Sequence, residues 1–251
     1  DILADDRVLP IVNNAHELRL VPRHKDYCIH VDTGMNRFGF NISDIDKLPK
    51  RAAMLMSHFV SSGAPSDHKT RQQLSLFEYA RSTLKPERSS LANSEGILYI
   101  PDAHYDLCRP GIALYGGLDH HLFRPTLSLR AHVAITRMIR SGDTVGYSAT
   151  FTAKSDMIVH TLPIGYADGL PRTLSNKSFI SSQHGVIQFV GVISMDSCVV
   201  TTQAPINAHE KWITLIGNIR DLCNLADAAG TIPYELLTRL GNEFRGKRHE
   251  G

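Results

Sequence analysis

The order of strands and helices along the chain constrains its fold more than any other sequence feature. In residues 1–117, apolar segments typical of strands alternate with segments of helical spacing. The predicted strands are residues 27–31, 53–60, 89–93 and 105–109, with a short apolar run at 8–12. The predicted helical segments between them are residues 14–20, 43–48 and 66–84. We expect Asn13-Asn14 to cap the first of these segments and Ser43 to cap the second. This alternation is typical of parallel β–α–β units and predicts about half of an eight-stranded TIM barrel.

After residue 117 this alternation ends. Strands are predicted at residues 127–139, 157–163, 186–192, 197–201 and 212–216, with no long helices between them. Two short helices are expected near the end, at residues 219–229 and 234–240. The pattern predicts an antiparallel β domain, and the boundary falls near residues 118–125. We therefore expect an α/β plus all-β protein, with a partial (β/α)8 TIM barrel in residues 1–120 and a C-terminal antiparallel β domain in residues 121–251.

Composition excludes several other classes of protein. Of the 251 residues, 42% are hydrophobic and 21% are charged, which suits a globular protein. A net charge of +2, with only a short basic run at residues 245–248, gives no reason to expect a nucleic-acid partner. No apolar run approaches the ~18 residues that span a bilayer, so we expect no membrane partner.

The cysteines lie far apart and form neither a C-x-x-C pair nor a zinc-ligand spacing. We therefore expect no metal site, and reduced thiols in a cytoplasmic protein. The cysteines are Cys28, Cys108, Cys198 and Cys223.

A candidate phosphate site follows the last predicted strand of the barrel half. Arg109 precedes Pro110, which has no N–H, and Gly111, which allows a ligand to approach the backbone. The amides of Gly111 and Ile112 could face a phosphate beside Arg109, and Ser94 begins a polar turn after the preceding strand. Barrel enzymes commonly bind phosphate at this place. The same residues also fit a simple tight turn.

Several tyrosines of the second half stand at turns and element ends. Tyr147 follows a glycine, Tyr166 lies in a loop with two prolines and two glycines, and Tyr234 begins a helix. The segment Ser194-Met195-Asp196 ends a strand on polar residues. Tyrosines at such places can also be packing residues with a hydrated hydroxyl.

Together these motifs resemble the alanine racemase family, in the order in which that family carries them. The resemblance covers essentially the whole chain, and its most specific parts are Arg-Pro-Gly-Ile at 109–112 and Gly-Tyr-Ala-Asp-Gly at 165–169. The other parts are Asp-Thr-Gly-Met-Asn-Arg at 32–37, Ala-Asn-Ser at 92–94, Gly-Tyr at 146–147, Ser-Met-Asp at 194–196 and Tyr-Glu-Leu-Leu-Thr-Arg-Leu-Gly at 234–241.

The resemblance implies a cytoplasmic isomerase that interconverts L- and D-alanine and supplies D-alanine for peptidoglycan. It would act through an aldimine of pyridoxal 5'-phosphate (PLP) by a two-base mechanism. The resemblance places Arg109 against the pyridine nitrogen of PLP. The residues that it assigns to the phosphate are Ser94, Gly111, Ile112 and Tyr234.

The resemblance also assigns residues to the substrate and to the proton transfer. Tyr147 would be a catalytic base that each subunit of a homodimer contributes to the other subunit's site. Arg37 and the Met195 amide would hold the substrate carboxylate, with Asp196 beside them. The two residues expected to shape the hydrogen bonds around the ring and the site entrance are His58 and Tyr166.

This chemistry suits the residue types. Racemisation removes the α-proton from one face and returns a proton to the other, so it needs two acid/base groups. An arginine cannot accept a proton, so it would keep the ring nitrogen of PLP unprotonated and limit side reactions such as transamination. The pKa of a tyrosine hydroxyl is ~10 in water, so a tyrosine can act as a base only where a neighbouring group favours its phenolate.

The sequence departs from the family pattern in two places. The family's PLP-binding lysine lies near its amino terminus, and no lysine of this chain stands in a matching context. We therefore expect the chain to lack the family's first third, to hold about strands 4–8 of the barrel and to be inactive alone. The second departure is His30, which stands where family members often carry a carbamylated lysine that buttresses the arginine at Arg37. Histidine cannot be carbamylated in that way.

Two alternatives remain open at this point. The chain could be a barrel protein that binds PLP or phosphate without turnover. It could also be an amino-acid decarboxylase of the same PLP fold type III. The pattern of such decarboxylases includes a phosphate-binding loop with a glycine triplet, and no such triplet occurs in this sequence.

Overall fold

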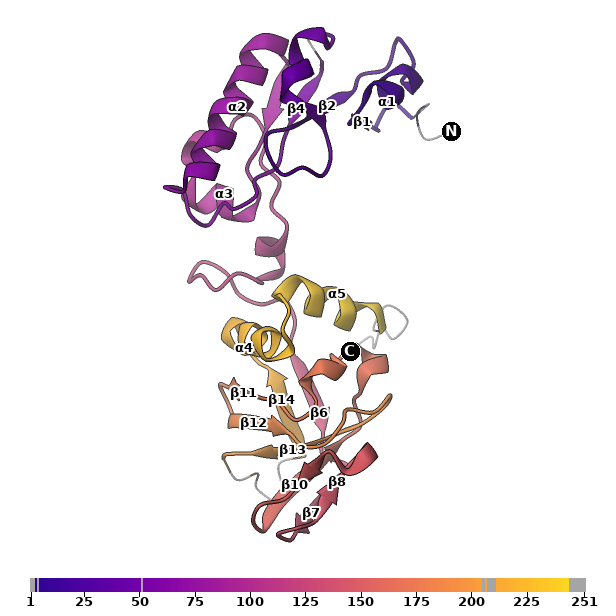
Figure 1. The fold of residues 1–251 in the computed structure, drawn as a ribbon, viewed down its shortest axis with the longest axis vertical. Helices are drawn as coiled ribbons and strands as arrows, with labels where there is room; N and C mark the ends of the chain where they lie inside the picture. Colours follow the sequence, from indigo (N-terminus) through magenta and orange to yellow (C-terminus); the bar gives the residue numbers. More distant parts are fainter. Residues whose placement is uncertain (1–2, 4, 51, 205, 207–210, 244–251) are drawn as a thin grey trace. The chain divides into compact units, whose positions relative to one another are not determined.

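The computed structural model describes residues 3, 5–50, 52–204, 206 and 211–243. Its contacts divide the chain into two compact units, residues 1–111 and 112–251 (Figure 1). The predicted basic run at residues 245–248 lies outside the described residues. Each unit is described separately below.

The first unit is built on a parallel sheet with the strand order β1-β2-β4-β5. A short fifth strand, β3, pairs with β2 outside this order, also in parallel. The strands are β1 (Ile11–Val12), β2 (Cys28–Asp32), β3 (Phe40–Asn41), β4 (Met54–Met56) and β5 (Arg88–Ser90). The helices are α1 (Ala15–Leu20), α2 (His68–Leu84) and α3 (Ser94–Tyr99), with 3-10 turns η2 (Ile42–Lys47) and η3 (Pro101–Ala103). The predicted alternation of strands and helices is confirmed.

The two faces of this sheet carry different side chains because successive residues of a strand point to opposite sides. Ile29 and Leu55 belong to a cluster that includes Phe77 of α2, so this face packs against helices. Cys28 and Met54 form a second, smaller cluster with Met56 and Leu9. The pairing register aligns His30 with Met56, and Met56 with Ser90. The face away from the helices therefore carries a partly polar row near the strand ends.

The prediction of a strand at residues 105–109 is wrong. The segment begins with Tyr105, whose φ of +44° lies outside the β region. It is followed by Pro110, which has no N–H to donate to a neighbouring strand. It still runs beside β5, because the amides of Asp106 and Leu107 each donate to the Ser89 carbonyl at 3.2 Å. The amide of Arg109 then donates to the Ala92 carbonyl at 2.9 Å. Arg109 is therefore fixed next to the end of β5 without belonging to a strand.

Polar side chains begin the helices of this unit. The side chain of Asn14 accepts hydrogen bonds from the first-turn amides of α1, as predicted, and Asp67 does the same for α2. Asn41, rather than the expected Ser43, caps η2. The predicted strand at 53–60 ends earlier, at Met56, so that the residues after it form a loop at the end of the sheet.

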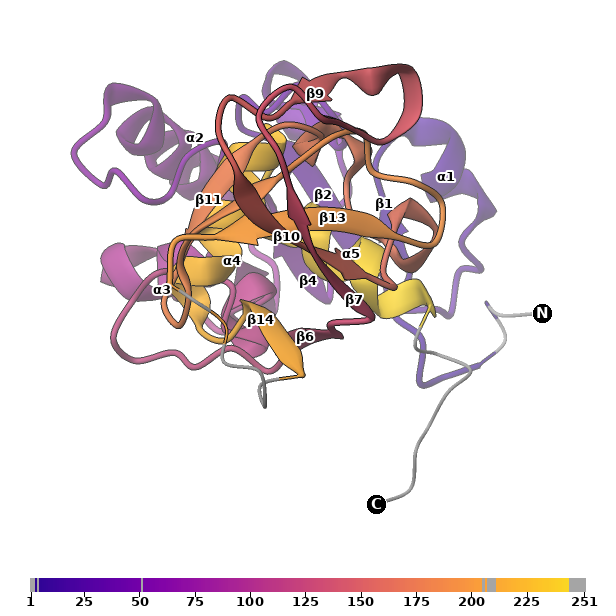
Figure 2. The same ribbon diagram turned by 90° about the horizontal axis from the view of Figure 1, so that it is seen from below.

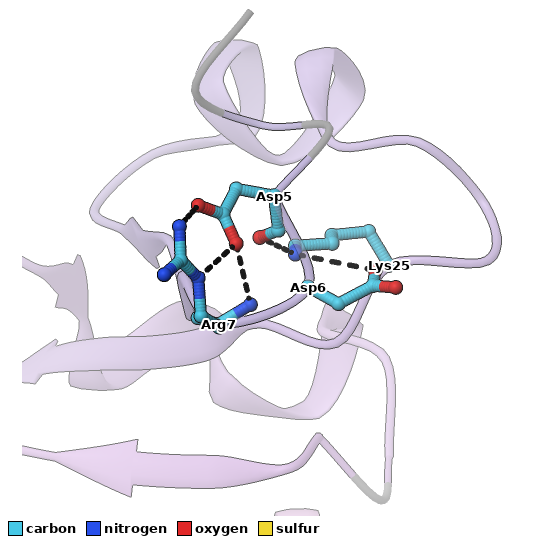
Figure 3. A network of polar contacts seen from close by, with 4 residues as sticks. All are labelled: Asp5, Asp6, Arg7 and Lys25. Carbon is cyan, nitrogen blue, oxygen red and sulfur yellow. Dashed lines mark hydrogen bonds and ion pairs between the residues drawn. The ribbon is translucent and has the colours of Figure 1, made fainter.

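A buried lysine anchors the segment that leads into β1 (Figure 3). The Nζ of Lys25 donates to the Asp5 carbonyl at 2.6 Å and lies 3.9 Å from a carboxylate oxygen of Asp6. Arg7 pairs with the Asp5 carboxylate at 2.6 Å, on the exposed side. A buried ammonium needs such partners to offset the loss of hydration. Lys25 is thus committed to holding residues 5–7 in place.

The second unit is mainly antiparallel, as predicted. A five-stranded sheet has the order β11-β12-β13-β10-β7, and two further pairs are β14-β6 and β8-β9. The strands are β6 (Leu129–His132), β7 (Ile135–Ile139), β8 (Thr144–Val145), β9 (Phe151–Thr152), β10 (Met157–Leu162), β11 (Ser178–Ser181), β12 (Gly185–Phe189), β13 (Cys198–Thr202) and β14 (Trp212–Ile216). The predicted strand at 127–139 is two strands, and β8, β9 and β11 were not predicted.

Helices α4 (Ile219–Ala229) and α5 (Pro233–Glu243) complete this unit, at the places predicted for them. Both helices contribute to the main core of the unit, which contains Phe179, Phe189, Leu222 and Leu236. Viewed from below, α4 and α5 lie behind the strands of the five-stranded sheet (Figure 2).

The described part of the chain contains no helix that is both long and apolar enough to cross a membrane. Within the same residues, no group of three or more histidine, cysteine or acidic side chains could hold a metal ion. All four cysteines are free thiols, as predicted. Burial raises the pKa of Cys28 and of Cys198 to about 12, so both remain protonated at neutral pH.

Candidate functional site

Arg109 is the central charged group of the first unit's candidate site. Its Nη1 donates to the Ser90 hydroxyl in a short hydrogen bond, and its Nη2 donates to the Ser57 carbonyl at 2.5 Å. The same Nη2 lies 3.4 Å from the Leu91 carbonyl and 3.4 Å from Nδ1 of His58. No ion pair with a carboxylate forms at Arg109 among the described residues. Burial lowers the pKa of Arg109, which nevertheless remains charged because arginine titrates so high.

His58 is held as a neutral imidazole. A guanidinium can only donate, so the Nδ1 of His58 that faces Arg109 must accept and its proton must lie on Nε2. Burial, then the charges of Arg109 and Arg37, lower the pKa of His58. The site therefore combines one fixed positive charge with a neutral ring beside it.

Ser94 and Gly111 are in contact, although residues 105–109 before Gly111 form no strand. The Gly111 amide donates to the Ser94 hydroxyl at 2.8 Å, so this amide already has a partner in the structure. A Cβ built on Gly111 would meet no atom within 4 Å, which shows that this backbone faces open space. The Ser94 side chain itself is buried, so the exposed part of this pair is the backbone at Gly111.

His30 lies in a polar chain that fixes its tautomer. The carboxylate of Glu17 accepts from both the backbone amide and the side-chain amide of Asn13, at 2.7 and 3.0 Å. The amide oxygen of Asn13 therefore faces Nδ1 of His30, 2.9 Å away, and Nδ1 carries the proton. Burial first, then the charge of Arg109, lowers the pKa of His30 to about 4. His30 is thus an uncharged ring whose Nε2 has its lone pair available.

Arg37 stands on a loop whose first turn is held by hydrogen bonds to the Asp32 carboxylate. One carboxylate oxygen of Asp32 accepts from the amides of Gly34, Met35 and Asn36, at 2.8, 2.8 and 3.1 Å. The loop closes at Gly39, where a Cβ would lie 2.7 Å from the Asp32 amide nitrogen. The Arg37 side chain is exposed and lies over the ring of Phe38 at 5.9 Å. Local hydrogen bonds therefore shape the loop that presents Arg37.

We predict that His30 makes the stability of the protein pH-dependent. Its pKa is about 4 when folded and near 6.5 when unfolded, so the unfolded chain takes up the proton first as pH falls. The stability that His30 contributes is complete above ~6.5 and is lost as pH falls towards ~4, by up to about 3 kcal/mol. The free energy of urea unfolding, measured between pH 7 and pH 4, should fall less steeply in His30→Asn than in the wild type. Equal slopes would show that folding leaves the pKa of His30 unchanged.

In the second unit, Tyr166 and the segment 194–196 are joined through their backbones. The Tyr166 amide donates to the Ser194 carbonyl at 3.1 Å, and the next amide, of Ala167, donates to the Met195 carbonyl at 2.9 Å. Tyr166 and Met195 keep exposed side chains, at 41% and 59% of their full accessibility. The Asp196 side chain is also exposed and accepts a hydrogen bond from Ser197 at 3.1 Å. The structure thus brings three of the predicted site residues together.

Tyr147 lies on a strained turn of the second unit. Gly146, Ser148 and Ala149 have φ values of +76°, +58° and +47°, a conformation that costs energy in residues other than glycine. The Tyr147 side chain is 71% exposed. The turn packs closely on the backbone at 191–192, where a Cβ on Gly146 would lie 3.2 Å from the Val192 amide. A rigid turn therefore holds Tyr147 out into solvent.

The remaining predicted phosphate residues belong to the second unit and lie apart in its sequence. Ile112 begins η4 (Ile112–Tyr115), and its side chain is buried, so only its backbone is suited to a ligand. Tyr234 lies in the first turn of α5 with 48% of its surface exposed. The structure describes Arg109, His58, Ser94 and Gly111 in one unit and these two residues in the other.

Sequence reasoning missed the neutral acceptors around Arg109. Ser57, Ser90 and the Leu91 carbonyl hold the guanidinium, and Asn13 holds His30. A usable signal was present only for Ser57 and Ser90, which are small polar residues in buried positions. Ser90 ends β5, and Ser57 directly follows the neighbouring parallel strand β4.

We predict that Gly165 is required for the contact between Tyr166 and residues 194–195. A Cβ at Gly165 would lie 2.4 Å from the carbonyl oxygens of both Ser194 and Met195. Gly165→Ala should therefore destabilise the protein by about 2 to 3 kcal/mol, as overpacking of a close contact does. Denaturant unfolding is the measurement, and Gly111→Ala, where a Cβ meets no atom within 4 Å, is the control. Equal losses in the two variants would contradict this contact.

Two descriptions of known protein families match this chain. "Alanine racemase, N-terminal domain" matches residues 1–119, and "Alanine racemase, C-terminal domain" matches residues 126–248. A relative from Jannaschia sp., an alanine racemase, is 36% identical over 97% of this chain and 72% of its own length. The chain belongs to the alanine racemase family. A second alanine racemase, from Methylobacterium nodulans, is 38% identical over 89% of the chain and 64% of its own length.

Solved structures of alanine racemases share the fold. The crystal structure of the Bartonella henselae enzyme with covalently bound pyridoxal phosphate has a TM-score of 0.82 and 31% identity, covering 95% of this chain and 72% of that one. The biosynthetic alanine racemase from Pseudomonas aeruginosa has a TM-score of 0.77 and 30% identity, covering 92% and 70%. These comparisons favour a racemase over a binding protein without turnover or a decarboxylase. The chain spans 64 to 72% of the length of these alanine racemases.

Proposed function

We propose that this protein is a PLP-dependent racemase that interconverts L- and D-alanine. The observation that carries the proposal is the environment of Arg109, a charged guanidinium at the end of a parallel sheet whose observed acceptors are all neutral. Family membership supplies the reaction, because the relatives that share this fold are alanine racemases.

The residues present fit PLP. Arg109 and the neutral His58 suit a pyridine ring whose nitrogen accepts rather than donates a hydrogen bond. Ser94 and the open backbone at Gly111 suit a phosphate, with the Ile112 amide and the Tyr234 hydroxyl as further donors. PLP supplies an electron sink when it is bound, and the protein tunes it through the group at its ring nitrogen.

The chain's other site residues act on the substrate. We assign the carboxylate of alanine to Arg37 and to the Met195 amide, with Asp196 beside them. Tyr147 takes or returns the α-proton at its phenolic oxygen on one face of the substrate, and Tyr166 restricts the entrance. Its exposed position suits Tyr147 for reaching a substrate outside its own turn.

The proposal extends to the organisation of the protein. We propose that residues 1–120 form later strands of a TIM barrel, about strands 4–8, and that residues 121–251 form the C-terminal β domain. We also propose a homodimer in the cytoplasm, in which each β domain serves the partner's barrel. Its product, D-alanine, would supply peptidoglycan synthesis.

Racemisation by the full gene product with added PLP tests the function, and Arg109→Glu tests the site. The wild type should interconvert L- and D-alanine, measured by chiral chromatography. Arg109→Glu should racemise more slowly and form more pyruvate per turnover, because a carboxylate favours a protonated ring nitrogen and so a stronger electron sink. An unchanged ratio of pyruvate to racemised alanine would show that Arg109 does not face the ring. Absence of racemisation by the wild type would refute the function.

Subunit exchange tests whether Tyr147 serves the partner's site. Tyr147→Phe and Arg109→Ala, each in the full gene product, should both be poor racemases. Mixed and allowed to exchange, they should regain about a quarter of wild-type activity, because about half the dimers are hybrids with one intact site. Native mass spectrometry verifies the exchange. Activity no greater than the sum of the two variants would place Tyr147 in its own subunit's site.

A further inference from the structure

Gln73 is a buried polar residue that no sequence motif singles out. It lies on α2, and its side chain is fully buried. Both the nitrogen and the oxygen of its side-chain amide nevertheless form hydrogen bonds. The Nε2 donates to the Thr33 hydroxyl at 3.1 Å and to the His58 carbonyl at 3.0 Å. The Oε1 accepts from the Val60 amide at 2.9 Å. An amide is expensive to bury without partners, so these bonds make the position of Gln73 specific.

The backbone that Gln73 holds is the segment that positions Arg109. Residues 57–60 follow β4 directly and form no regular structure of their own. Gln73 bonds this segment at two points, on either side of Phe59. The same segment presents the Ser57 carbonyl and the His58 ring to Nη2 of Arg109. A shift of residues 57–60 would therefore move two of the acceptors of the guanidinium at once.

A second link runs through hydroxyl groups. The Thr33 hydroxyl, which accepts from Gln73, is 2.8 Å from the Ser57 hydroxyl, and both residues are buried. Thr33 belongs to the loop that carries Arg37. Gln73 thus connects α2 with the ends of β2 and β4 through a closed set of buried hydrogen bonds.

We infer that Gln73 is a positioning residue, which fixes residues 57–60 and thereby the orientation of Arg109 and His58. It acts through these residues and touches neither substrate nor cofactor. Its catalytic consequence rests on the proposed function, whereas its effect on Arg109 does not. Small displacements of a catalytic group are costly to a reaction, so the buried amide contributes to rate as well as to folding.

The test compares Gln73→Met with a matched variant on the same helix. Thr70 is also fully buried on α2, and its hydroxyl donates to the Ser61 carbonyl at 2.6 Å, outside the set that reaches Arg109. Thr70→Val therefore removes a buried hydrogen bond of the same helix without touching residues 57–60. A second pair of variants concerns Thr33. Thr33→Val removes the hydroxyl that contacts Gln73 and Ser57, and Thr33→Ser keeps a hydroxyl there.

The first measurement needs neither PLP nor activity. Phenylglyoxal modifies accessible guanidinium groups, and mass spectrometry of the digested full gene product gives the rate at Arg109. Gln73→Met and Thr33→Val should raise this rate about fivefold. This is the factor by which the loss of one hydrogen bond increases the local opening of the segment that it holds. Thr70→Val, at a similar loss of thermal stability, and Thr33→Ser should match the wild type. Equal rates in Gln73→Met and Thr70→Val would overturn the inference.

The second measurement is the ratio of pyruvate to racemised alanine in the PLP-loaded protein. Misplacement of Arg109 should raise this ratio in Gln73→Met and not in Thr70→Val, whereas a loss of folded protein lowers both products together. A changed rate at Arg109 in a protein whose wild type does not racemise alanine would refute the proposed function and leave the positioning role standing. Racemisation by the wild type with no change at Arg109 in Gln73→Met would refute the positioning role alone.

Discussion

The candidate site depends on one constraint, the holding of a guanidinium charge by neutral groups at the end of a parallel sheet. A partly buried charge needs several hydrogen bonds to offset its lost hydration. Arg109 obtains them from the Ser90 hydroxyl and from the carbonyls of Ser57 and Leu91. These acceptors stand at the ends of β4 and β5, and parallel pairing brings those ends together. The strand order and the segments that follow these strands bring the acceptors to this one side chain.

The same charge sets the protonation of its neighbours. Arg109 contributes, after burial, to the lowered pKa of both His30 and His58. Both rings are therefore neutral at pH 7, and each has a defined tautomer because Asn13 faces one and Arg109 faces the other. Arg109 is therefore the charged group among these three, and a neutral ring at position 30 supplies no negative charge. The hydrogen bonds of Asp32 instead order the loop that carries Arg37.

The sequence predicts these features to the extent that they are local. The alternation of elements, the caps at Asn14 and the helix at 219–229 follow from patterns within a few residues, and each is confirmed. The strand expected at 105–109 fails because tertiary contacts with Ser89 and Ala92, rather than a ladder, hold that segment. Gln73 is separated from Thr33 by 40 residues, so no local pattern reveals that they bond. Residues such as Gln73, which hold the segment around Arg109 in place, therefore leave no local signal in the sequence, whereas helices and their caps do.

The two units hold their candidate site residues in different ways. The loop at Tyr166 is locked against residues 194–195 by paired backbone hydrogen bonds and by the close approach that Gly165 allows. Tyr147 is instead presented by a strained turn into solvent, and its hydroxyl forms no hydrogen bond within the described residues. A tyrosine acts as a base only where a cation or a donor favours its phenolate. Its own turn supplies no such group, so the proposed role of Tyr147 requires one from outside that turn, as a site shared between two subunits would provide.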